Sequence, residues 1–345
     1  MAVYSEIAEA ALDSSNIIDN DVRLNYHCEA KKGRKSNMAV YKMGGFCIAF
    51  PMFKNDDPNS KICYRVWFVE DYYNRKFKEI CEHVSRMIRD FKLPYFVEYT
   101  FLPHAIKVGE EKLPGVKMKW IDGLSLNEWL RTHRDKAAIQ KLADSFMQMC
   151  KDFHKFGISH GDLSNSNILI NERAEIKLVD YDSVFTPSMG NQFYQTTAGQ
   201  DAFQHRERRS GNHQISARDD NFSQQIIYLS LLAMAHDVSL VDWIGENELL
   251  FNQQDLASES DFIKSRAYKA LSSLNEPEIQ SRLKELKSAI RGSLSDVRSI
   301  VELEVPKPKK YVEFCYICGH KFPNNADGYC TQCGTKRLVY SIRDN

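Results

Sequence analysis

The chain has 345 residues, of which 43% are hydrophobic and 27% charged. This is the composition of a globular protein, and it excludes a disordered, collagen-like or fibrous chain. The 46 basic residues balance the 46 acidic ones, so net charge provides no strong attraction to nucleic acid or an anionic membrane.

The distribution of cysteine and apolar residues points to a reducing, soluble setting. Five of the nine cysteines are scattered through the first 150 residues, and four lie within the last 31, which is unlike a disulfide framework. The first 20 residues contain no basic region followed by an apolar run, so no secretory signal is expected. The longest apolar stretch, 226–235, has half of the ~20 residues that a membrane-spanning helix needs. We expect a cytoplasmic protein with no membrane attachment.

The first 37 residues are polar and weakly periodic, and they end in a basic run at 31–35. We expect 1–37 to be a mobile or lightly ordered lead-in to the first domain. The alternative is that the basic run forms a functional patch.

Residues 38–121 have the composition of a β-rich region with one helix. Apolar residues at spacings of three and four predict a helix over 77–91, which Pro94 ends. Turn residues separate the β-type runs, and the first three runs predict an antiparallel meander. The expected strands are 38–43, 46–53, 62–69, 95–101, 104–108 and 115–121.

Helical patterns dominate residues 122–302. Two short apolar strands, 168–170 and 176–179, flank a turn, and a long polar stretch covers 183–217. The order of elements predicts an α+β chain in which a β-rich region precedes a helical one. The expected helical segments are 126–132, 136–156, 219–236 and 262–300.

The most informative segment contains His160, Asp162 and Asn167, directly before the strand at 168–170. Asp180 follows eighteen residues after Asp162, at the end of the next strand. Phosphoryl transfer needs a carboxylate that orients the acceptor hydroxyl and receives its proton. It also needs oxygen ligands for Mg²⁺, which neutralises charge on the phosphate oxygens. A polar turn is the alternative, but it does not account for the Asn offset and the second Asp together.

This pattern resembles the catalytic loop H-R-D-x-x-x-x-N and the D-F-G metal turn of the protein-kinase-like superfamily. The resemblance is closest to divergent, prokaryote-type members. It implies a bilobal kinase-like fold with an N-lobe at 38–121 and a C-lobe at 122–302. It also implies ATP and Mg²⁺ as cofactors, Asp162 as the catalytic carboxylate, and Asn167 and Asp180 as metal ligands.

Two further segments resemble landmarks of the same family. Asp220 opens a helix after the polar stretch, and it looks like the aspartate that braces the family's catalytic loop. Met118, Lys119 and Trp120 look like the hinge whose backbone groups bond to adenine, with Met118 as the gatekeeper. Alternatively, Met118 is an ordinary core residue.

The N-lobe departs from the family pattern at the positions that bind phosphate. Arg65 stands where the family carries a lysine on its third strand, and an arginine fork is not equivalent to a compact ammonium. In the family, the residue at this strand position pairs with a glutamate on the following helix. The resemblance therefore implies that Arg65 pairs with Glu79 or Glu82, and we favour Glu79. A solvent-facing Arg65 is the alternative. The glycine-rich loop is reduced to Gly44 and Gly45, which form either an ordinary hairpin turn or a backbone cradle for phosphates.

The C-lobe departs from the pattern at two positions. Gly161 replaces the arginine of the catalytic loop, which removes the usual docking charge for a phosphorylated activation segment, so we expect no such switch. Asp182 replaces the glycine of the metal turn, and we favour a turn cap over a spare metal ligand. The stretch 183–217 takes the place of the family's peptide-substrate loop, and its simpler interpretation is a solvated, partly mobile loop.

Prolines and lysines in 303–312 predict an extended linker to a module at 313–340 that holds two C-x-x-C-G knuckles. The knuckles predict one structural Zn²⁺ site, because four thiolates fill all the tetrahedral positions. The ligands are Cys315, Cys318, Cys330 and Cys333. The glycine of each knuckle is expected at positive φ. The module resembles a zinc ribbon, for which we expect a protein partner and disfavour nucleic acid; two disulfides, the alternative, conflict with a reducing compartment.

Together these features predict an ATP- and Mg²⁺-dependent phosphotransferase, specifically a serine/threonine protein kinase, with a zinc ribbon for recognition or assembly. The departures at Arg65 and the glycine loop leave open a pseudokinase that binds or scaffolds with weak or no catalysis. A small-molecule kinase of the aminoglycoside or choline type is the third interpretation, because such enzymes share the His-Gly-Asp sequence.

Overall fold

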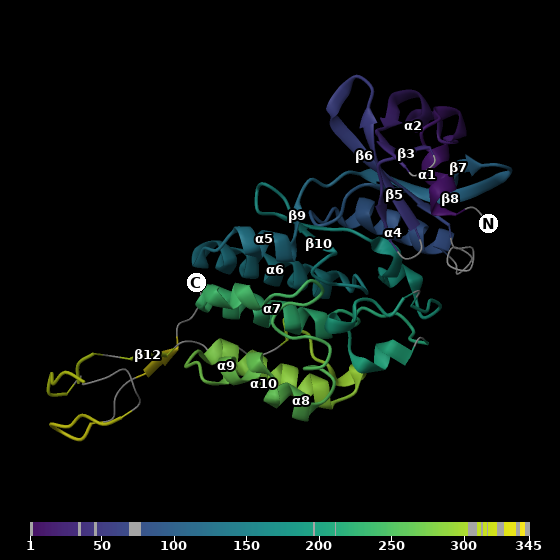
Figure 1. Cartoon of the computed structure of the whole chain (residues 1–345). Coiled ribbons are helices and arrows are strands. Elements are labelled where there is room, and N and C mark those ends of the chain that lie inside the picture. The colour runs from purple at the N-terminus through teal and green to yellow at the C-terminus, as the bar shows by residue number, and fades with distance from the viewer. Residues whose placement is uncertain are drawn as a thin grey trace.

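The computed structural model confirms the expected α+β chain, with a sheet-rich lobe above a helical lobe (Figure 1). A small module with four cysteines follows at the C-terminus. The structure describes residues 3–33, 36–44, 47–68, 77–195, 197–210, 212–302, 309–311, 313–315, 317–322, 328–335 and 339–341. Within these ranges, every helix is too short or too polar to span a bilayer.

An antiparallel sheet of six strands forms the upper lobe. The strands run in the order β1-β5-β6-β8-β7, and β4 pairs with β5 on the side of the path. They are β1 (Tyr26–Cys28), β4 (Lys42–Met43), β5 (Cys47–Lys54), β6 (Asp57–Trp67), β7 (Tyr99–Val108) and β8 (Glu111–Lys119). The meander predicted from the sequence is confirmed, because β4, β5 and β6 pair in succession.

One strand replaces the two expected at 95–101 and 104–108. The register of β7 against β8 shifts between Leu102 and Ile106, and Pro103 lies inside this irregularity. A proline cannot donate to the ladder and is tolerated at bulges. The strand therefore continues through the proline, and its partner β8 begins at Glu111, four residues earlier than predicted.

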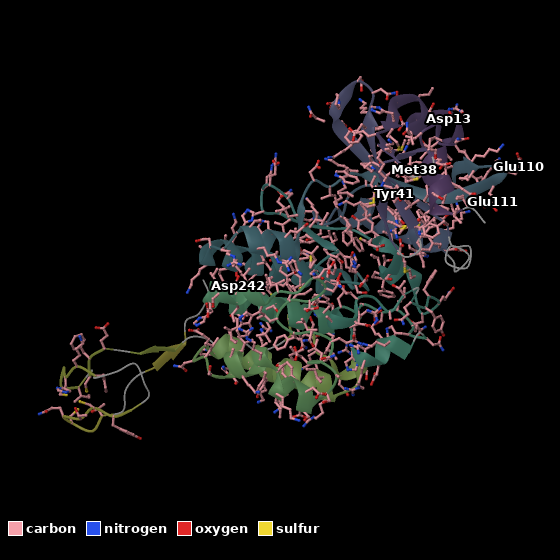
Figure 2. The ribbon with its side chains drawn as sticks, in the orientation of Figure 1. Asp13, Met38, Tyr41, Glu110, Glu111 and Asp242 are labelled. Atoms are coloured by element: carbon pink, nitrogen blue, oxygen red, sulfur yellow. The ribbon has the colours of Figure 1, made fainter. Side chains whose placement is uncertain are left out.

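The expectation of a mobile or lightly ordered lead-in is wrong for the described part of 1–37. This part forms α1 (Tyr4–Ala10), η1 (Ser14–Asn16), α2 (Asn20–Asn25), β1 and β2 (Ala30–Lys32), which pairs with β3 (Asn37–Ala39). Ile7, Ile17 and Val22 are fully buried against the outer face of the sheet. Met38 and Tyr41 pack against the same cluster (Figure 2). Each helix is too short to show a period of its own, so its stability depends on tertiary packing.

The predicted helix over 77–91 is confirmed as α4 (Phe77–Phe91). Its apolar face covers the inner face of the sheet, where Ile80, Cys81 and Val84 join the main core. The helix ends before Lys92, which has a positive φ of 50°, two residues ahead of Pro94. Glu79 and Glu82 lie on its exposed face.

The lower lobe is built around α7, which is buried along nearly its whole length and packs between α6 and α10. Gly157 ends α6 with a φ of 63°, the left-handed conformation that glycine adopts without strain. The helices are α5 (Leu126–Thr132), α6 (Lys136–Phe156), α7 (Asn221–His236), α8 (Glu259–Lys264), α9 (Arg266–Ser272) and α10 (Pro277–Arg291). The 3₁₀ turns are η2 (Tyr181–Ser183), η3 (Pro187–Met189), η4 (Asp201–Phe203), η5 (Arg206–Ser210), η6 (Val238–Trp243) and η7 (Leu294–Asp296).

Two small sheets complete the fold. β9 (Leu124–Ser125), β10 (Ile168–Ile170) and β11 (Ile176–Leu178) form an antiparallel sheet between the lobes, in the order β11-β10-β9. The expected linker 303–312 lies mainly outside the described residues. Its described part, β12 (Lys309–Tyr311), pairs with β13 (Val339–Ser341).

We predict that Ile7→Ala lowers the free energy of unfolding by about 2–5 kcal/mol, because it empties a fully buried site in the upper lobe. Leu24→Ala, at a side chain that is 68% exposed in the adjacent helix, is the control and is expected to change it by less than about 0.5 kcal/mol. Urea titration followed by fluorescence measures both. Equal midpoints for the two variants would contradict the packing of the N-terminal segment on the sheet.

Candidate active site

The predicted catalytic residues meet in the loop before β10. The Asn167 side chain donates from Nδ2 to the main-chain oxygen of Asp162 at 2.8 Å and to its Oδ2 at 3.1 Å. The other carboxylate oxygen, Oδ1, accepts from the backbone N–H of Gln200 at 3.0 Å. Burial raises the pKa of Asp162, and the nearby Asp180 carboxylate adds to this effect.

A second aspartate braces the same loop, as the sequence predicted. Asp220, at the start of α7, accepts hydrogen bonds from the backbone N–H groups of His160 and Gly161, the latter at 2.9 Å. The ring of His160 pairs through Nε2 with the carbonyl oxygen of Val179 at 2.9 Å. Burial raises the pKa of Asp220 even though His160 and the two N–H donors oppose the shift. The loop is thus tied to both α7 and β11.

Glycine at position 161 has a steric reason. Its φ is +78°, and a Cβ there would lie 2.2 Å from the carbonyl oxygen of Ser183. An L-residue would meet both the positive φ and this clash. The family's arginine cannot occupy this backbone position without a shift of the 180–183 turn.

Asp180 lies in the turn after β11, where it meets Arg65 from β6. The Arg65 Nη1 atom donates to Asp180 Oδ1 at 2.9 Å. The surrounding protein alone would raise the pKa of Asp180, but the Arg65 guanidinium and His160 outweigh this, so the pKa lies below its ordinary value. Asp180 has a φ of 66°, which is uncommon but tolerated for aspartate.

The carboxylate that holds Arg65 most closely is Asp182, which corrects two expectations. Arg65 Nη1 and Nη2 contact Asp182 Oδ1 and Oδ2 at 3.0 and 2.5 Å, a bidentate pair, and both side chains are almost buried. Asp182 is therefore an ion-pair partner of Arg65, and not the turn cap alone that the sequence analysis favoured. Glu79 and Glu82 point to solvent from α4, and Glu82 pairs with Lys78 at 3.8 Å; the described ion pairs do not join Arg65 to either glutamate.

A cavity of about 470 Å³ lies between the lobes next to these carboxylates. Most of the residues predicted to contact nucleotide or metal line it: Gly44, Arg65, Met118, Lys119, Trp120, Asn167 and Asp180. Glu79 is not among the lining residues, and Gly45 lies outside the described residues. Asp162 adjoins the cavity through its hydrogen bond to Asn167.

The sequence interpretation missed other lining residues, including Lys42, Cys63 and Leu169. A signal for Cys63 was present, because side chains two apart on a strand share a face and Arg65 had been assigned to the cleft. Lys42 lies with its Nζ 5.7 Å from the centroid of the Trp120 ring, a contact that only the pairing of β4 with β5 brings about.

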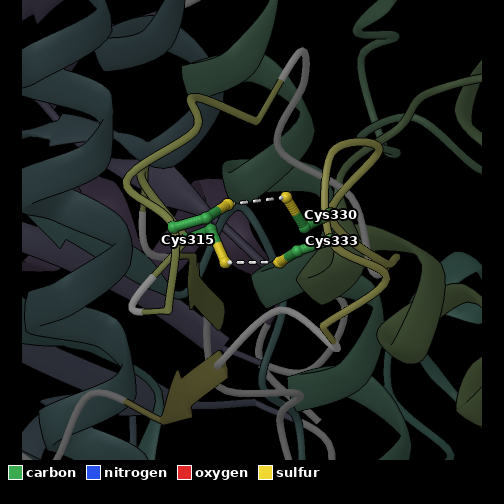
Figure 3. Close-up of side chains that lie close together, drawn as sticks. Cys315, Cys330 and Cys333 are labelled. Atoms are coloured by element: carbon green, nitrogen blue, oxygen red, sulfur yellow. Dashed lines mark hydrogen bonds between the residues drawn. The ribbon is translucent and has the colours of Figure 1, made fainter.

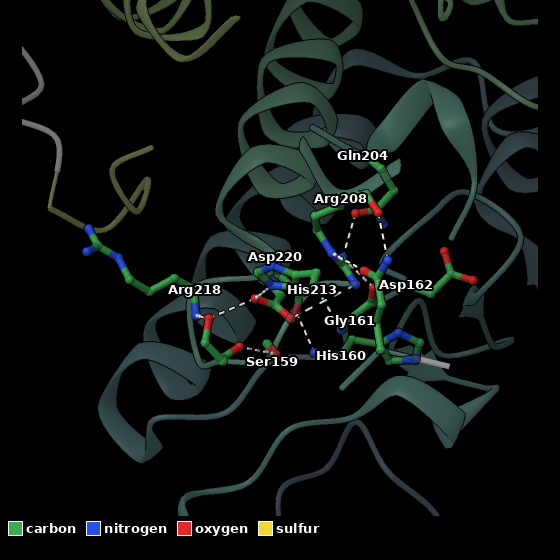
Figure 4. A network of polar contacts seen from close by, with 12 residues as sticks. Ser159, His160, Gly161, Asp162, Gln204, Arg208, His213, Arg218 and Asp220 are labelled. Carbon is green, nitrogen blue, oxygen red and sulfur yellow. Dashed lines mark hydrogen bonds and ion pairs between the residues drawn. The ribbon is translucent and has the colours of Figure 1, made fainter. Parts of the chain in front are cut away.

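The polar stretch 183–217 is not a solvated loop in its described part. It forms a series of 3₁₀ turns whose Phe203 and Arg208 side chains are completely buried. Arg208 points toward the catalytic loop from η5 (Figure 4). The stretch packs beneath the loop, and Gln200 reaches the Asp162 carboxylate from it.

The four C-terminal cysteines form a cluster of the expected kind. Their Sγ atoms all lie within 4.8 Å of one another, and the Cys315–Cys333 and Cys318–Cys330 pairs are each 3.5 Å apart (Figure 3). Tetrahedral zinc with Zn–S bonds of about 2.3 Å separates its sulfur ligands by about 3.8 Å. Gly319 and Gly334 have φ values of 73° and 71°, which confirms the predicted knuckle turns, and the cluster fits a zinc ribbon.

The model of the protein kinase domain family matches residues 109–290, just over half of the chain. The match contains the catalytic loop, the metal turn and α7, and most of α10. The chain therefore belongs to the protein kinase domain family, which is a family of phosphotransferases. None of the curated proteins matches it.

We predict that Asp182→Asn lowers the free energy of unfolding by about 3 kcal/mol, because it removes one partner of an almost buried ion pair. Glu79→Gln, on the exposed face of α4, is the matched control and is expected to have an effect below about 0.5 kcal/mol. Chemical denaturation of Asp182→Asn, Arg65→Met and the variant with both changes measures the coupling of the pair in a double-mutant cycle, with Glu79→Gln measured beside them. If Glu79→Gln lowered the free energy of unfolding more than Asp182→Asn does, the expected ion pair between Arg65 and Glu79 would be supported instead.

We predict about one bound Zn²⁺ per chain, which Cys330→Ser largely removes because three thiolates leave the tetrahedron incomplete. Cys28→Ser in β1, outside the cluster, is the control and should retain the metal. Elemental analysis of the purified proteins measures the zinc content of each variant. The same zinc content in the two variants would count against a four-cysteine site.

Proposed function

We propose that the protein is an ATP- and Mg²⁺-dependent phosphotransferase with Asp162 as the catalytic carboxylate. The observation that carries the proposal is the hydrogen bond of Asn167 to Asp162, made beside a cavity that Asn167 and Asp180 both line. One carboxylate for the acceptor hydroxyl and two oxygen ligands for metal are the groups that in-line phosphoryl transfer requires.

The cavity suits a nucleotide in size and in the chemistry of its lining groups. Its volume of about 470 Å³ is in the usual range for small-molecule sites. Residues 118–120 line the cavity and supply backbone hydrogen-bonding groups for a base. Arg65 and Asp180 line it too, and phosphate and metal would bind beside them.

The chain's own residues would orient and activate the acceptor. Asp162 is held by Asn167 and by the Gln200 N–H, so its carboxylate is preorganised to accept a hydrogen bond from a hydroxyl. Burial and the neighbouring Asp180 carboxylate raise the pKa of Asp162 above its ordinary value. Mg²⁺, when bound at Asn167 and Asp180, would supply charge neutralisation on the phosphate.

We propose a serine or threonine side chain of a protein as the acceptor. The described part of 183–217 packs against Asp162 through Gln200, which provides an ordered surface for a peptide beside the catalytic carboxylate. The zinc ribbon, joined after the kinase domain, is proposed to serve recognition or assembly in the cytoplasm. A metabolite acceptor is the alternative outcome of a substrate screen.

A pseudokinase is the second candidate, and the Arg65–Asp180 ion pair favours it. The pair of 2.9 Å engages the carboxylate that would bind metal. Nucleotide binding would have to release Asp180 while Asp182 retains Arg65. A scaffold without catalysis would keep both contacts.

We predict that Asp162→Asn and Asp180→Asn each lower phosphate transfer from labelled ATP by at least about 100-fold. Asp162→Asn removes the proton acceptor, and Asp180→Asn removes a charged metal ligand. Asp90→Asn, an exposed aspartate of α4 that pairs with Arg89, is the control and should retain the wild-type rate. Protein and metabolite panels as acceptors distinguish the two substrate classes.

Equal transfer by wild type and Asp162→Asn would exclude the assigned role of Asp162. Binding of Mg²⁺–ATP in a thermal shift assay, with no transfer to any acceptor or to the protein itself, would favour the pseudokinase.

A further inference from the structure

The catalytic loop receives a buried positive charge from the 197–210 segment. The Arg208 side chain has no exposed surface. Its Nη1 atom donates to the carbonyl oxygen of Gly161 at 2.6 Å and to Gln204 Oε1 at 2.6 Å (Figure 4). Its Nε atom donates to Gln195 Oε1 at 3.3 Å.

The contact acts on the peptide unit that leads directly into Asp162. The carbonyl of Gly161 and the N–H of Asp162 belong to one planar peptide group, so a bond to this oxygen restrains the Asp162 backbone. Asp220 holds the preceding N–H groups of His160 and Gly161. Arg208 and Asp220 therefore hydrogen-bond to consecutive peptide groups. These groups flank Gly161, whose φ of +78° would otherwise be free to change.

The same segment also reaches the carboxylate of Asp162. Its oxygen Oδ1 accepts from the Gln200 N–H at 3.0 Å, and a Cβ at Gly199 would lie 2.5 Å from that oxygen. Backbone and side chain of Asp162 are thus both restrained from residues 199–208. The described contacts that restrain Asp162 come from the backbone N–H of Gln200 and the side chain of Arg208.

Neighbouring arginines separate this contact from simple anchoring of the segment. Arg206 donates to the carbonyl oxygens of Arg291 and Gly292 at the end of α10, at 3.2 and 2.9 Å. Arg209 donates to the carbonyl oxygen of Asp201 at 2.9 Å. All three belong to η5, but only Arg208 contacts the catalytic loop among the bonds of the described residues.

Burial of a guanidinium is costly, so its presence needs a compensating partner. The nearest carboxylate of Arg208 is Asp219, with Nη2 and Oδ2 4.0 Å apart. Asp219 is itself held by His213 at 2.9 Å and Ser216 at 2.7 Å. Arg208 Nη2 and Asp219 Oδ2 have no hydrogen-bond partner among the described residues, so Asp219 offsets the charge only by proximity, while the short hydrogen bonds of Arg208 are directed at Gly161 and Gln204.

We propose that Arg208 is a positioning residue that sets the Gly161–Asp162 peptide, and with it the Asp162 carboxylate, without phosphorylation of the segment. The catalytic consequence rests on the proposed phosphotransferase function. The family's catalytic loop carries an arginine at the position of Gly161. In this chain Arg208 brings the positive charge to the loop from η5. This explains how position 161 can be glycine while the loop stays ordered.

Arg208→Met tests the proposal, with Arg206→Met as the matched control. We expect Arg208→Met to lower kcat at least tenfold and to change KM for ATP less than twofold, because Arg208 does not line the nucleotide cavity. Arg206→Met removes an anchor of the same segment and should leave kcat within twofold. Arg208→Lys keeps the charge and should recover part of the lost kcat. Equal losses of kcat in the two methionine variants would overturn the proposal.

Hydrogen–deuterium exchange provides a readout that needs no activity. Arg208→Met is expected to speed exchange of the amides of 160–162 at least tenfold, and Arg206→Met to leave them unchanged. Unchanged exchange at 160–162 in a folded Arg208 variant would overturn the proposal. If Arg208→Met does not fold, Arg208→Lys takes its place, because it loses the planar fork and should show a smaller increase in exchange at the same amides. Absence of phosphate transfer by wild type would count against the proposed function alone, since the exchange experiment stands without it.

Discussion

Arg65 forms the central electrostatic contact of the candidate site. It projects from β6 in the upper lobe and meets Asp180 and Asp182 in the turn after β11. Charge-assisted, bidentate hydrogen bonds of this kind are strong and directional, and removing one partner of a nearly buried pair leaves an uncompensated charge. This guanidinium is the largest cause that lowers the pKa of Asp180, and it joins β6 of the upper lobe to the turn after β11.

A second arginine, Arg208, contacts the catalytic loop from η5. Arg208 binds the Gly161 carbonyl where Arg65 binds carboxylates, so two fixed cations border the loop and turn that carry Asp162 and Asp180. Asp220 supplies the opposite polarity through its bonds to backbone N–H groups. Asp162 therefore sits among directed dipoles and charges that are already in place without a ligand, which is the general requirement for electrostatic preorganisation.

Burial explains why side chains hydrogen-bond to the backbone of the catalytic loop, even though His160 Nδ1, Arg208 Nη2 and Asp219 Oδ2 have no hydrogen-bond partner among the described residues. Each N–H or C=O of the catalytic loop that is removed from water needs a partner, because an unpaired buried group costs about 1–3 kcal/mol. The loop cannot form a regular ladder, since it must present Asp162 and Asn167 to the cleft. Side chains of α7 and η5 supply the missing partners. The four-cysteine module, in contrast, has only a small apolar core, of which Phe322 is part, so we expect a metal held by the four thiolates to supply most of its order.

Features that depend on a few neighbouring residues were predictable from the sequence. The offset of Asn167 from Asp162, the strand pair β10–β11, the period of α4 and the knuckle glycines all follow from local geometry and appear where expected. Their physical basis is a repeat or a fixed chemical spacing, which a few neighbouring residues suffice to specify. Asp220 was predictable in the same way, as the opening residue of an apolar helix.

Other features were decided only when distant segments packed together. The partner of Arg65 is 117 residues away at Asp182, and Arg208 reaches back 47 residues to Gly161. The N-terminal helices are ordered because the outer face of the sheet offers them an apolar surface. The sequence alone allows several partners for an isolated charge or a short helix. Burial in the folded protein then selects one of them. The sequence by itself thus determined the kinase-like loop and the four-cysteine cluster, while the tertiary structure decided which charges meet, because only packing fixes the distances on which electrostatic pairing depends.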